Sequence, residues 1–338
     1  MNNAVIFGGT GFIGSFFAVH LIENKKFDKV FLFDKQSSNN SGFNHREEMI
    51  QRHKNIIYVE GDVQQTIIFN PDMHISLIAN FAAVHREPGH LDHEYFDCNI
   101  AGAENVCKWA EKNNCNKIIF SSSIAPYGPS EVPKDEKSMP CPKTAYGSSK
   151  LAAEKIHQIW QEKNIDNHLV IVRPGVVFGP TEGGNVSRLI KAVQNNYFFY
   201  MGNKKTRKAG VYVKELCRAM YWVLESDKSK LEKITLFNMT MNPGPSIEEY
   251  VLSILKILDR KRIILNVPNF FILTAAYLID FIAKPFSINH PFSPVRIKKL
   301  TSSNNILPTY LNNSGYKYKY NLDEAFLDWK KDCPEEWN

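Results

Sequence analysis

The sequence predicts an α/β fold in which helices cover both faces of an open, doubly wound parallel sheet. In the first half of the chain, short apolar runs alternate with stretches whose apolar residues follow a helical period. The runs are continuous, and several are rich in Val and Ile, as expected for strands that are buried on both faces. A glycine-rich turn, residues 8–14, follows the first run directly and favours the same fold.

Six buried strands are predicted in this half. They are residues 4–7, 30–33, 56–59, 77–81, 117–120 and 169–172. Apolar residues at helical spacing predict helices at 12–24 and 99–113, and "PKTAYGSSKLAAEK" at 142–155 has the pattern of an amphipathic helix opening. This order gives the β-α alternation of a parallel sheet.

After about Gly179 the rhythm changes, and helical pieces mix with loops that contain Asn, Pro and Lys. The helices predicted there are residues 186–194, 214–225, 247–258, 270–282 and 322–330. We expect residues 1–180 to form the sheet domain, with return segments from about 206–240. Residues 181–338 should mainly form a smaller mixed α/β cap.

Composition excludes several classes of protein. The 338 residues carry a net charge of +6, but the basic residues are scattered along the sequence. The sequence contains no stripe of interleaved aromatic and basic residues, so nucleic-acid binding is not predicted. The six cysteines show no metal-ligand spacing, which predicts reduced thiols, no metal site and a cytoplasmic location. The apolar segment at 270–283 contains Asp280 and is shorter than the ~20 residues of a membrane span. It is predicted as a buried or interface helix, with shallow membrane contact left open.

The turn "GGTGFIG" has the spacing of a dinucleotide-binding loop. Gly8 would allow the tight turn, Gly11 the approach of a pyrophosphate, and Gly14 close packing of helix on strand. The N-terminus of the following helix offers free N–H groups and a positive dipole end to phosphates. The predicted cofactor-binding residues of this loop are Gly8, Thr10, Gly11, Phe12, Ile13 and Gly14.

Asp34 stands 20 positions after Gly14, at the end of the second predicted strand. A carboxylate there can accept both hydroxyls of the adenosine ribose and repels a 2′-phosphate. No arginine follows in "DKQSSNN", although Lys35 does. The predicted cofactor is therefore NAD in preference to NADP.

A proton-handling group follows the fifth strand. Ser122 and Ser123 lie at its carboxyl end, the edge where such sheets bind ligands. Tyr146 and Lys150 are four residues apart, which puts them on one helix face. A free phenol titrates near pH ~10, and a neighbouring ammonium group favours the phenolate. We expect Tyr146 to exchange a proton with a substrate hydroxyl while hydride moves between substrate and nicotinamide.

The motifs "GGTGFIG", "FSSSIAPYG", "YGSSK" and "RPGVVFGP", in this order, resemble the extended short-chain dehydrogenase/reductase family, in its NAD-dependent epimerase/dehydratase branch. The resemblance covers about the first 180 residues and implies a Rossmann-type sheet with a substrate-binding cap. It implies Tyr146, Lys150 and Ser123 as catalytic residues, with Tyr146, Lys150 and Ser122 also close to the nicotinamide. It further implies cofactor contacts from Asp62, Val63, Ala82, Ala83, His85 and Asn99. On the residues alone, His85 reads equally well as a loop histidine and Asn99 as a helix N-cap.

Two departures from the family pattern narrow the chemistry. Ile124 and Ala125 stand where 4,6-dehydratases have Asp-Glu, so dehydration is not expected. Val176 stands where many nucleotide-sugar members have an asparagine that binds substrate. In the cap, ordinary surface residues are the competing interpretation of the predicted substrate-binding residues, which, besides Ser123, are Asn185, Arg188, Arg207 and Arg296.

The resemblance implies a nucleotide-sugar 4-epimerase for polysaccharide biosynthesis, with a UDP-sugar favoured as substrate. It would oxidise C4 to a ketone and return the hydride to the other face. A 4-keto nucleotide-sugar reductase is the first alternative; a hydroxysteroid dehydrogenase-like oxidoreductase and a non-catalytic dinucleotide sensor are weaker ones. Members of the family often form homodimers through two helices, here residues 102–113 and 146–163.

Overall fold

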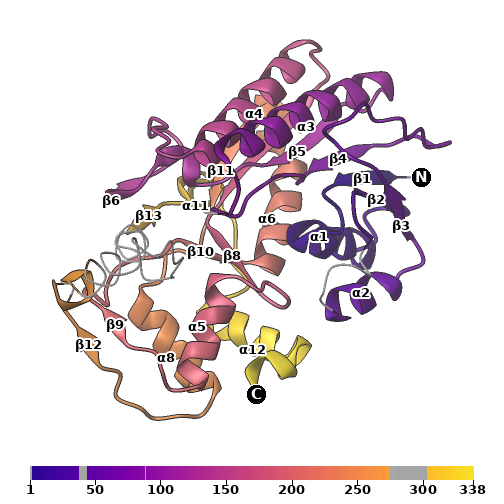
Figure 1. Ribbon diagram of the computed structural model, residues 1–338. Helices are drawn as coiled ribbons and strands as arrows, with labels where there is room; N and C mark the ends of the chain where they lie inside the picture. The colour runs from indigo at the N-terminus through magenta and orange to yellow at the C-terminus, as the bar shows by residue number, and fades with distance from the viewer. Residues whose placement is uncertain (1, 38–43, 88, 269, 275–276, 278–302) are drawn as a thin grey trace.

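The computed structural model describes the chain apart from residues 1, 38–43, 88, 269, 275–276 and 278–302 (Figure 1). Its centre is a seven-stranded sheet, parallel throughout, in the order β11-β7-β5-β4-β1-β2-β3. The strands are β1 (Asn3–Phe7), β2 (Lys29–Asp34), β3 (Ile56–Glu60), β4 (Leu77–Asn80), β5 (Lys117–Ser121), β7 (His168–Pro174) and β11 (Ile234–Met239). All six predicted strands are confirmed. The seventh, β11, comes from the second half of the chain and pairs with β7 at the sheet edge.

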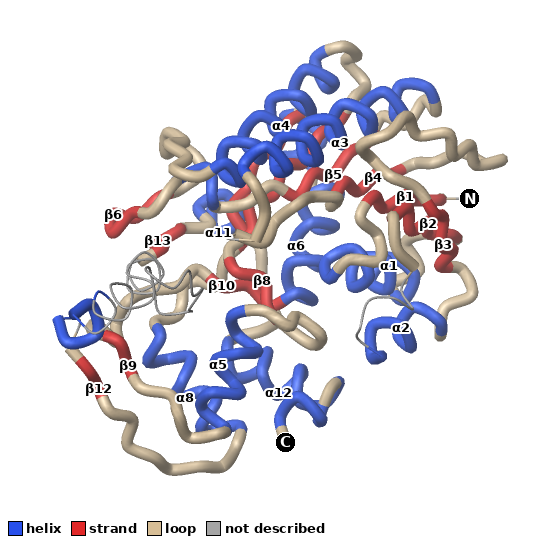
Figure 2. Tube along the Cα trace, viewed as in Figure 1, coloured by secondary structure: helices blue, strands red, loops and turns tan. Residues whose placement is uncertain are grey.

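Helices cover both faces of the sheet (Figures 1 and 2). On one face, α3 (Asp92–Lys112) lies beside α4 (Ala145–Glu162); on the other are α1 (Phe12–Glu23) and α6 (Val213–Glu225). Along β1, Ala4 and Ile6 belong to the core under α1 and α6, whereas Val5 and Phe7 belong to the core under α3 and α4. The strand's two-residue period therefore divides one apolar run between two cores, which is why the run is continuous.

The strand order reverses at β1, which lies between β2 and β4. In such sheets the ligand crevice lies outside the carboxyl ends of the strands at this switch point. Because the strands are parallel, the segments that follow β1, β2, β4 and β5 emerge at this same edge. They are the glycine turn, Asp34, residues 81–85 and residues 121–123.

The second half of the chain supplies the remaining elements. Four predicted helices are confirmed, as α5 (Asn185–Gln194), α6, α8 (Ile247–Ile257) and α12 (Leu322–Asp332). Most of the helix predicted at 270–282 lies outside the described residues. Within the part that is described, residues 270–274 are helical. The smaller elements are α2 (Asn44–Gln51), α7 (Asp227–Glu232), α11 (Thr309–Asn313) and the strand pairs β6 (Ser130–Lys134) with β13 (Asn304–Ile306), β8 (Val176–Phe178) with β10 (Gly210–Tyr212), and β9 (Tyr200–Met201) with β12 (Asn266–Val267). Within the part of the chain that the structure describes, no helix has both the length and the apolar content to cross a membrane.

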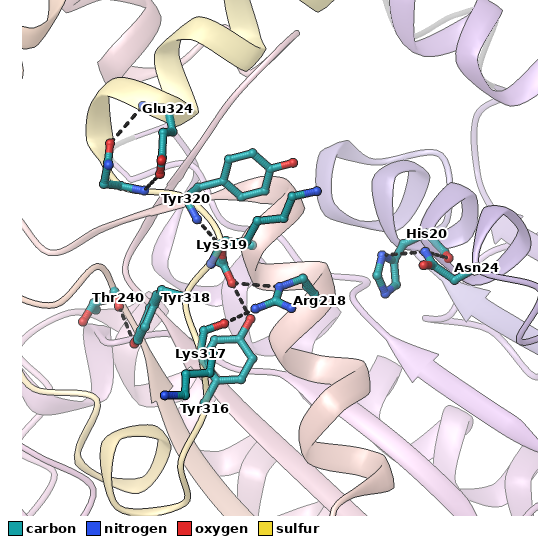
Figure 3. Close-up of polar contacts among 12 residues, drawn as sticks. His20, Asn24, Arg218, Thr240, Tyr316, Lys317, Tyr318, Lys319, Tyr320 and Glu324 are labelled. Atoms are coloured by element: carbon teal, nitrogen blue, oxygen red, sulfur yellow. Dashed lines mark hydrogen bonds and ion pairs between the residues drawn. The ribbon is translucent and has the colours of Figure 1, made fainter.

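The segment before α12, residues 316–320, is fastened to α6 by a buried carboxylate (Figure 3). Glu215 on α6 accepts the hydroxyl of Tyr316 and the backbone N–H groups of Lys319 and Tyr320, the last two at 2.8 and 2.9 Å. Arg218, one turn later, donates to the carbonyl of Lys317. Burial and the adjacent Glu215 raise the pKa of the Tyr316 phenol far above its usual value, so this hydroxyl acts as a donor. These bonds tie the C-terminal part of the cap to the helix that covers the sheet.

Candidate active site

The turn after β1 is shaped so that only glycine fits at two of its positions. Gly8 has φ +75°, and a Cβ there would lie 2.6 Å from the backbone nitrogen of Ala82. A Cβ at Gly14 would lie 2.4 Å from the carbonyl oxygen of Gly8. Gly11 is the N-cap of α1 and contributes no side-chain bond to the helix end. The turn therefore leaves the first N–H groups of α1 without side-chain cover, as a phosphate cradle requires.

Two carboxylates stand beside this cradle at the ends of neighbouring strands. Asp34 is half-buried at the end of β2 and accepts the backbone N–H of Thr10 at 3.2 Å. Asp62, after β3, forms an ion pair with Lys35 across 2.9 Å. This ion pair places the Asp62 carboxylate against Lys35, the lysine that directly follows Asp34. These residues fit a dinucleotide whose adenosine ribose carries free hydroxyls.

Asn99 holds the loop that follows β4. Its Oδ1 accepts the N–H of Val84 at 2.9 Å, and its Nδ2 donates to the Val84 carbonyl at 3.2 Å and to Ser149 Oγ at 2.9 Å. The N-cap interpretation was wrong, because α3 begins at Asp92 and Asn99 is buried inside the helix. Asn99 thus fixes the backbone that presents Ala82 and Ala83, which are half-buried, while His85 is exposed.

The two serines after β5 face different partners. Ser123 lies beside Tyr146, where its hydroxyl acts to lower the pKa of the phenol, and its Oγ accepts the N–H of Ala125 at 3.1 Å. Ser122 instead donates its hydroxyl to Glu154 Oε1 at 2.5 Å and is buried. Ser123 is therefore the serine hydroxyl beside the Tyr146 phenol.

Tyr146 and Lys150 lie in the first turns of α4, which begins after its N-cap Thr144. Thr144 Oγ1 accepts the N–H of Gly147 at 3.1 Å and fixes where the helix starts. Tyr146 is half-buried with its ring 6.0 Å from that of Tyr95, and Lys150 is buried with Nζ 4.3 Å from the Phe120 ring centroid. The helix thus carries both groups into the protein at the carboxyl edge of the sheet.

The expected lowering of the phenol's pKa is not found in the chain by itself. Burial raises the pKa of Tyr146 to about 12, and the hydrogen bond from Ser123 only partly opposes this. Burial also lowers the pKa of Lys150 to about 8, with the carboxylate of Glu154 acting in the opposite direction. Sequence spacing does not report desolvation, which disfavours the charged form of both groups.

A buried ion pair on the same helix as Tyr146 and Lys150 was not predicted from the sequence. Glu154 on α4 accepts two bonds from Arg173 on β7, from Nε at 2.8 Å and from Nη2 at 2.6 Å. The guanidinium also lies 4.6 Å from the ring centroid of Tyr127. Glu154 follows Lys150 by four residues, so a charged residue on the buried face of this helix was the signal that could have revealed it.

The family follows from a comparison with known proteins. The NAD dependent epimerase/dehydratase family matches residues 4–238, which include the glycine turn, Ser123, Tyr146 and Lys150. The chain belongs to this family. It is accordingly an enzyme of the extended short-chain dehydrogenase/reductase type, as its motifs predicted.

Several relatives in the family are named as epimerases. The chain is 29% identical over 245 residues to the N-acetyl-alpha-D-glucosaminyl-diphospho-ditrans,octacis-undecaprenol 4-epimerase of Escherichia coli O157:H7, covering 72% of this chain and 73% of that one. It is 27% identical over 225 residues to a putative UDP-glucose 4-epimerase of Methanocaldococcus jannaschii, covering 64% and 71%. In fold it is similar to the UDP-glucuronic acid 4-epimerase of Bacillus cereus in complex with NAD, with TM-score 0.76, 17% identity and coverage of 99% and 100%.

The predicted substrate-binding residues of the cap lie in different settings. Arg207 is held by the cap itself, since Nη1 donates to the Gly244 carbonyl at 2.5 Å and lies 4.0 Å from the Glu249 carboxylate. Asn185 and Arg188 are exposed in the first turn of α5. Arg296 lies outside the described residues. Of this predicted set, Asn185 and Arg188 are therefore the described residues that are exposed.

Proposed function

We propose that this enzyme is an NAD-dependent 4-epimerase of a sugar bound through a diphosphate, with a UDP-sugar as the first substrate to test. The observation that carries the proposal is the position of Tyr146 and the buried Lys150, one helical turn apart at the start of α4, with Ser123 beside the phenol. This group and the glycine turn stand at the same edge of the sheet. A proton-exchanging phenol beside a dinucleotide cradle is what reversible oxidation of a carbinol needs.

NAD, when bound, would accept hydride from C4 of the sugar and return it to the opposite face. Tyr146 would take the proton of the C4 hydroxyl at its phenolic oxygen and give it back in the second half of the reaction. Ser123 would donate a hydrogen bond to the same sugar oxygen and keep it within reach of the phenol. Because burial alone holds the pKa of Tyr146 at about 12, the phenolate needs positive charge nearby, and Lys150 in its ammonium form supplies part of it.

The preference for NAD rests on Asp34 and on the Lys35–Asp62 ion pair. A 2′-phosphate would meet the Asp34 carboxylate, and the neighbouring lysine already has a carboxylate partner. An epimerase returns its hydride within one turnover, so a retained NAD needs no supply of reductant. The competing 4-keto-sugar reductase would instead consume NADPH or NADH.

The cofactor and the product decide between these activities. The purified enzyme is denatured by heat, and the released dinucleotide is identified and quantified. The untreated enzyme is incubated with UDP-, GDP- and dTDP-sugars, and the products are followed by NMR. We expect near-stoichiometric NAD and a 4-epimer of at least one sugar; net consumption of NADPH with a 4-keto sugar and no epimer would contradict the proposal.

A second candidate substrate is a sugar linked through diphosphate to a polyprenol. The Escherichia coli relative acts on such a molecule according to its name, and its alignment covers most of both chains. Val176 also departs from the asparagine that the family resemblance implies for nucleotide sugars; here it opens β8 and pairs with Gly210. Adding a polyprenyl-diphosphate N-acetylglucosamine to the same NMR panel distinguishes the two carriers of the shared sugar diphosphate.

A further inference from the structure

Two extended segments of the cap pair at its end away from α3 and α4 (Figure 1). β9 and β12 are parallel, with Tyr200 opposite Asn266 and Met201 opposite Val267. The N–H of Tyr200 donates to the Leu265 carbonyl at 2.8 Å. Residues 197–201 and 263–267 therefore run side by side.

Side chains alternate along both segments. Tyr200 is buried in the apolar cluster that continues from the α1 and α6 side of the sheet, and Phe198 and Ile264 pack against the same cluster. Their neighbours Tyr197, Phe199, Ile263 and Leu265 point outward, and Ile263 and Leu265 are 91% and 73% exposed. Successive residues of an extended segment point to opposite faces. Because Phe198, Tyr200 and Ile264 pack inward, the apolar residues that alternate with them are exposed to solvent.

Hydrogen bonds also tie the two segments together. Arg262 donates from Nη1 to Asn196 Oδ1 at 3.0 Å and from Nη2 to the Asn196 carbonyl at 2.8 Å. Arg260 donates to the Gln194 carbonyl at 2.6 Å. The outward apolar residues are thus presented by a fixed backbone.

Phe270 and Phe271 extend the apolar set shortly after β12. Both are exposed, and their rings pack edge to face with centroids 5.7 Å apart. The N–H of Phe271 donates to the Pro268 carbonyl at 3.1 Å, so the turn from β12 sets the position of the pair. We call the outward residues the cap corner: Tyr197, Phe199, Ile263, Leu265, Phe270 and Phe271.

Basic residues flank the cap corner along the chain. The segments 196–205 and 259–271 contain five basic residues, Lys204, Lys205, Arg260, Lys261 and Arg262, against the single acidic residue Asp259. Lys204 is paired with Glu248 from outside these segments. Lys205 and Lys261 are exposed. A set of exposed aromatic and aliphatic residues flanked by lysine and arginine matches a surface that lies in the interface of an anionic bilayer.

We propose that the cap corner docks this enzyme on the surface of a membrane that contains anionic lipids. The aromatic and aliphatic side chains enter the headgroup region, and Lys205 and Lys261 contact lipid phosphates. The inference deepens the second substrate proposed above, because an enzyme for a polyprenyl-diphosphate sugar must work where that lipid resides. It needs no spanning helix, in accord with the described residues.

The test is co-sedimentation of the full chain, without substrate, with vesicles of phosphatidylcholine alone or mixed equally with phosphatidylglycerol. We expect binding to the mixed vesicles that weakens with added salt. The double variant Ile263→Ser/Leu265→Ser should reduce the partition coefficient at least about tenfold, since it removes two side chains that would leave water on binding. Lys261→Glu should reduce it by about tenfold through charge reversal.

Ile165→Ser is the matched control, because Ile165 is 79% exposed after α4 and far along the chain from the cap corner. It should bind like the unmodified enzyme. Absence of binding to the mixed vesicles, or equal binding by the double variant, overturns the proposal. A dimer that dissociates only in the double variant would assign the corner to a second copy and also overturns it.

NAD content and 4-epimer formation are measured on the same variants. The double variant should retain both with a water-soluble UDP-sugar or short-chain lipid substrate, because the cap corner contains none of the catalytic residues. Loss of vesicle binding with retained NAD supports membrane docking whatever the sugar carrier is. Vesicle binding without any 4-epimer product would count against the proposed function and leave the docking surface standing.

Discussion

Functional residues are easier to predict from the sequence in the cofactor half of the molecule than in the cap. In the cofactor half, the glycine turn, Asp34 and the serines after β5 lie at strand ends, and parallel strands bring these positions to one edge. In the cap, polar residues of similar type have unlike roles: Arg207 bonds to Gly244 within the cap, while Arg188 is exposed. Local sequence therefore predicts a site where the topology gathers strand ends, and fails where packing alone decides which side chains are free.

The strongest test of the cofactor half is Tyr146→Phe. The ring remains, but the phenolic oxygen beside Ser123 is lost, so kcat should fall by about 10³–10⁴-fold. Bound NAD, measured after heat release, should stay near the unmodified level. Tyr221→Phe on α6 is the control and should keep full turnover. Turnover that survives Tyr146→Phe would remove the catalytic role and favour a dinucleotide sensor.

Glu154→Gln asks whether the ion pair behind the site matters for more than stability. Leaving Arg173 buried without its carboxylate should lower the free energy of unfolding by about 3–5 kcal/mol, measured by urea denaturation. Glu154 raises the pKa of Lys150, which burial holds at about 8. Without that carboxylate the ammonium loses its proton at lower pH, so the alkaline fall of kcat/KM should move to lower pH.

Glu162→Gln is the control for this change, at the exposed end of the same helix. It should leave both the unfolding free energy and the pH profile as they were. An unshifted alkaline limb in Glu154→Gln would show that the ion pair is structural only.

Gly14→Ala in the glycine turn and Gly244→Ala in the cap together compare how tightly the backbone is constrained in the two regions. The added Cβ would meet the Gly8 carbonyl oxygen at 2.4 Å, so the turn must open. We expect a loss of about 1–3 kcal/mol in stability together with reduced NAD content. Gly244→Ala in the cap meets its nearest atom at 3.7 Å and should change stability by less than about 1 kcal/mol. Equal effects at the two glycines would contradict the cradle.

Arg188→Ala is the smallest expected effect and tests the cap. If the exposed guanidinium binds the substrate diphosphate, KM should rise about tenfold, with kcat and NAD content nearly unchanged. Lys191→Ala, also exposed on α5, should behave like the unmodified enzyme. A rise in KM that both variants share would point to general charge attraction instead of a specific contact.

The pattern of the sequence predicted the six strands, the glycine turn and the Tyr146–Lys150 pair. These features depend on residues that are close in the chain, where strand period, helix period and turn chemistry operate. The alternative interpretation of Asn99 as a helix N-cap was wrong, because helix ends depend on capping geometry that one residue does not define. The pairing of β11 with β7 was also not predicted, because strand pairing depends on contacts between segments that are far apart in the chain.

The sequence by itself determined the family, the sheet and the chemical groups that face the cofactor edge, because those groups sit at fixed offsets from strands and helix turns. Only the tertiary structure decided that Ser123 lies beside Tyr146, whereas Ser122 donates a hydrogen bond to Glu154. It also decided that Glu154 forms an ion pair with Arg173. It also decided the direction in which burial moves the pKa of Tyr146 and Lys150. Desolvation and pairing between distant segments arise from packing, and no local run of residues encodes them.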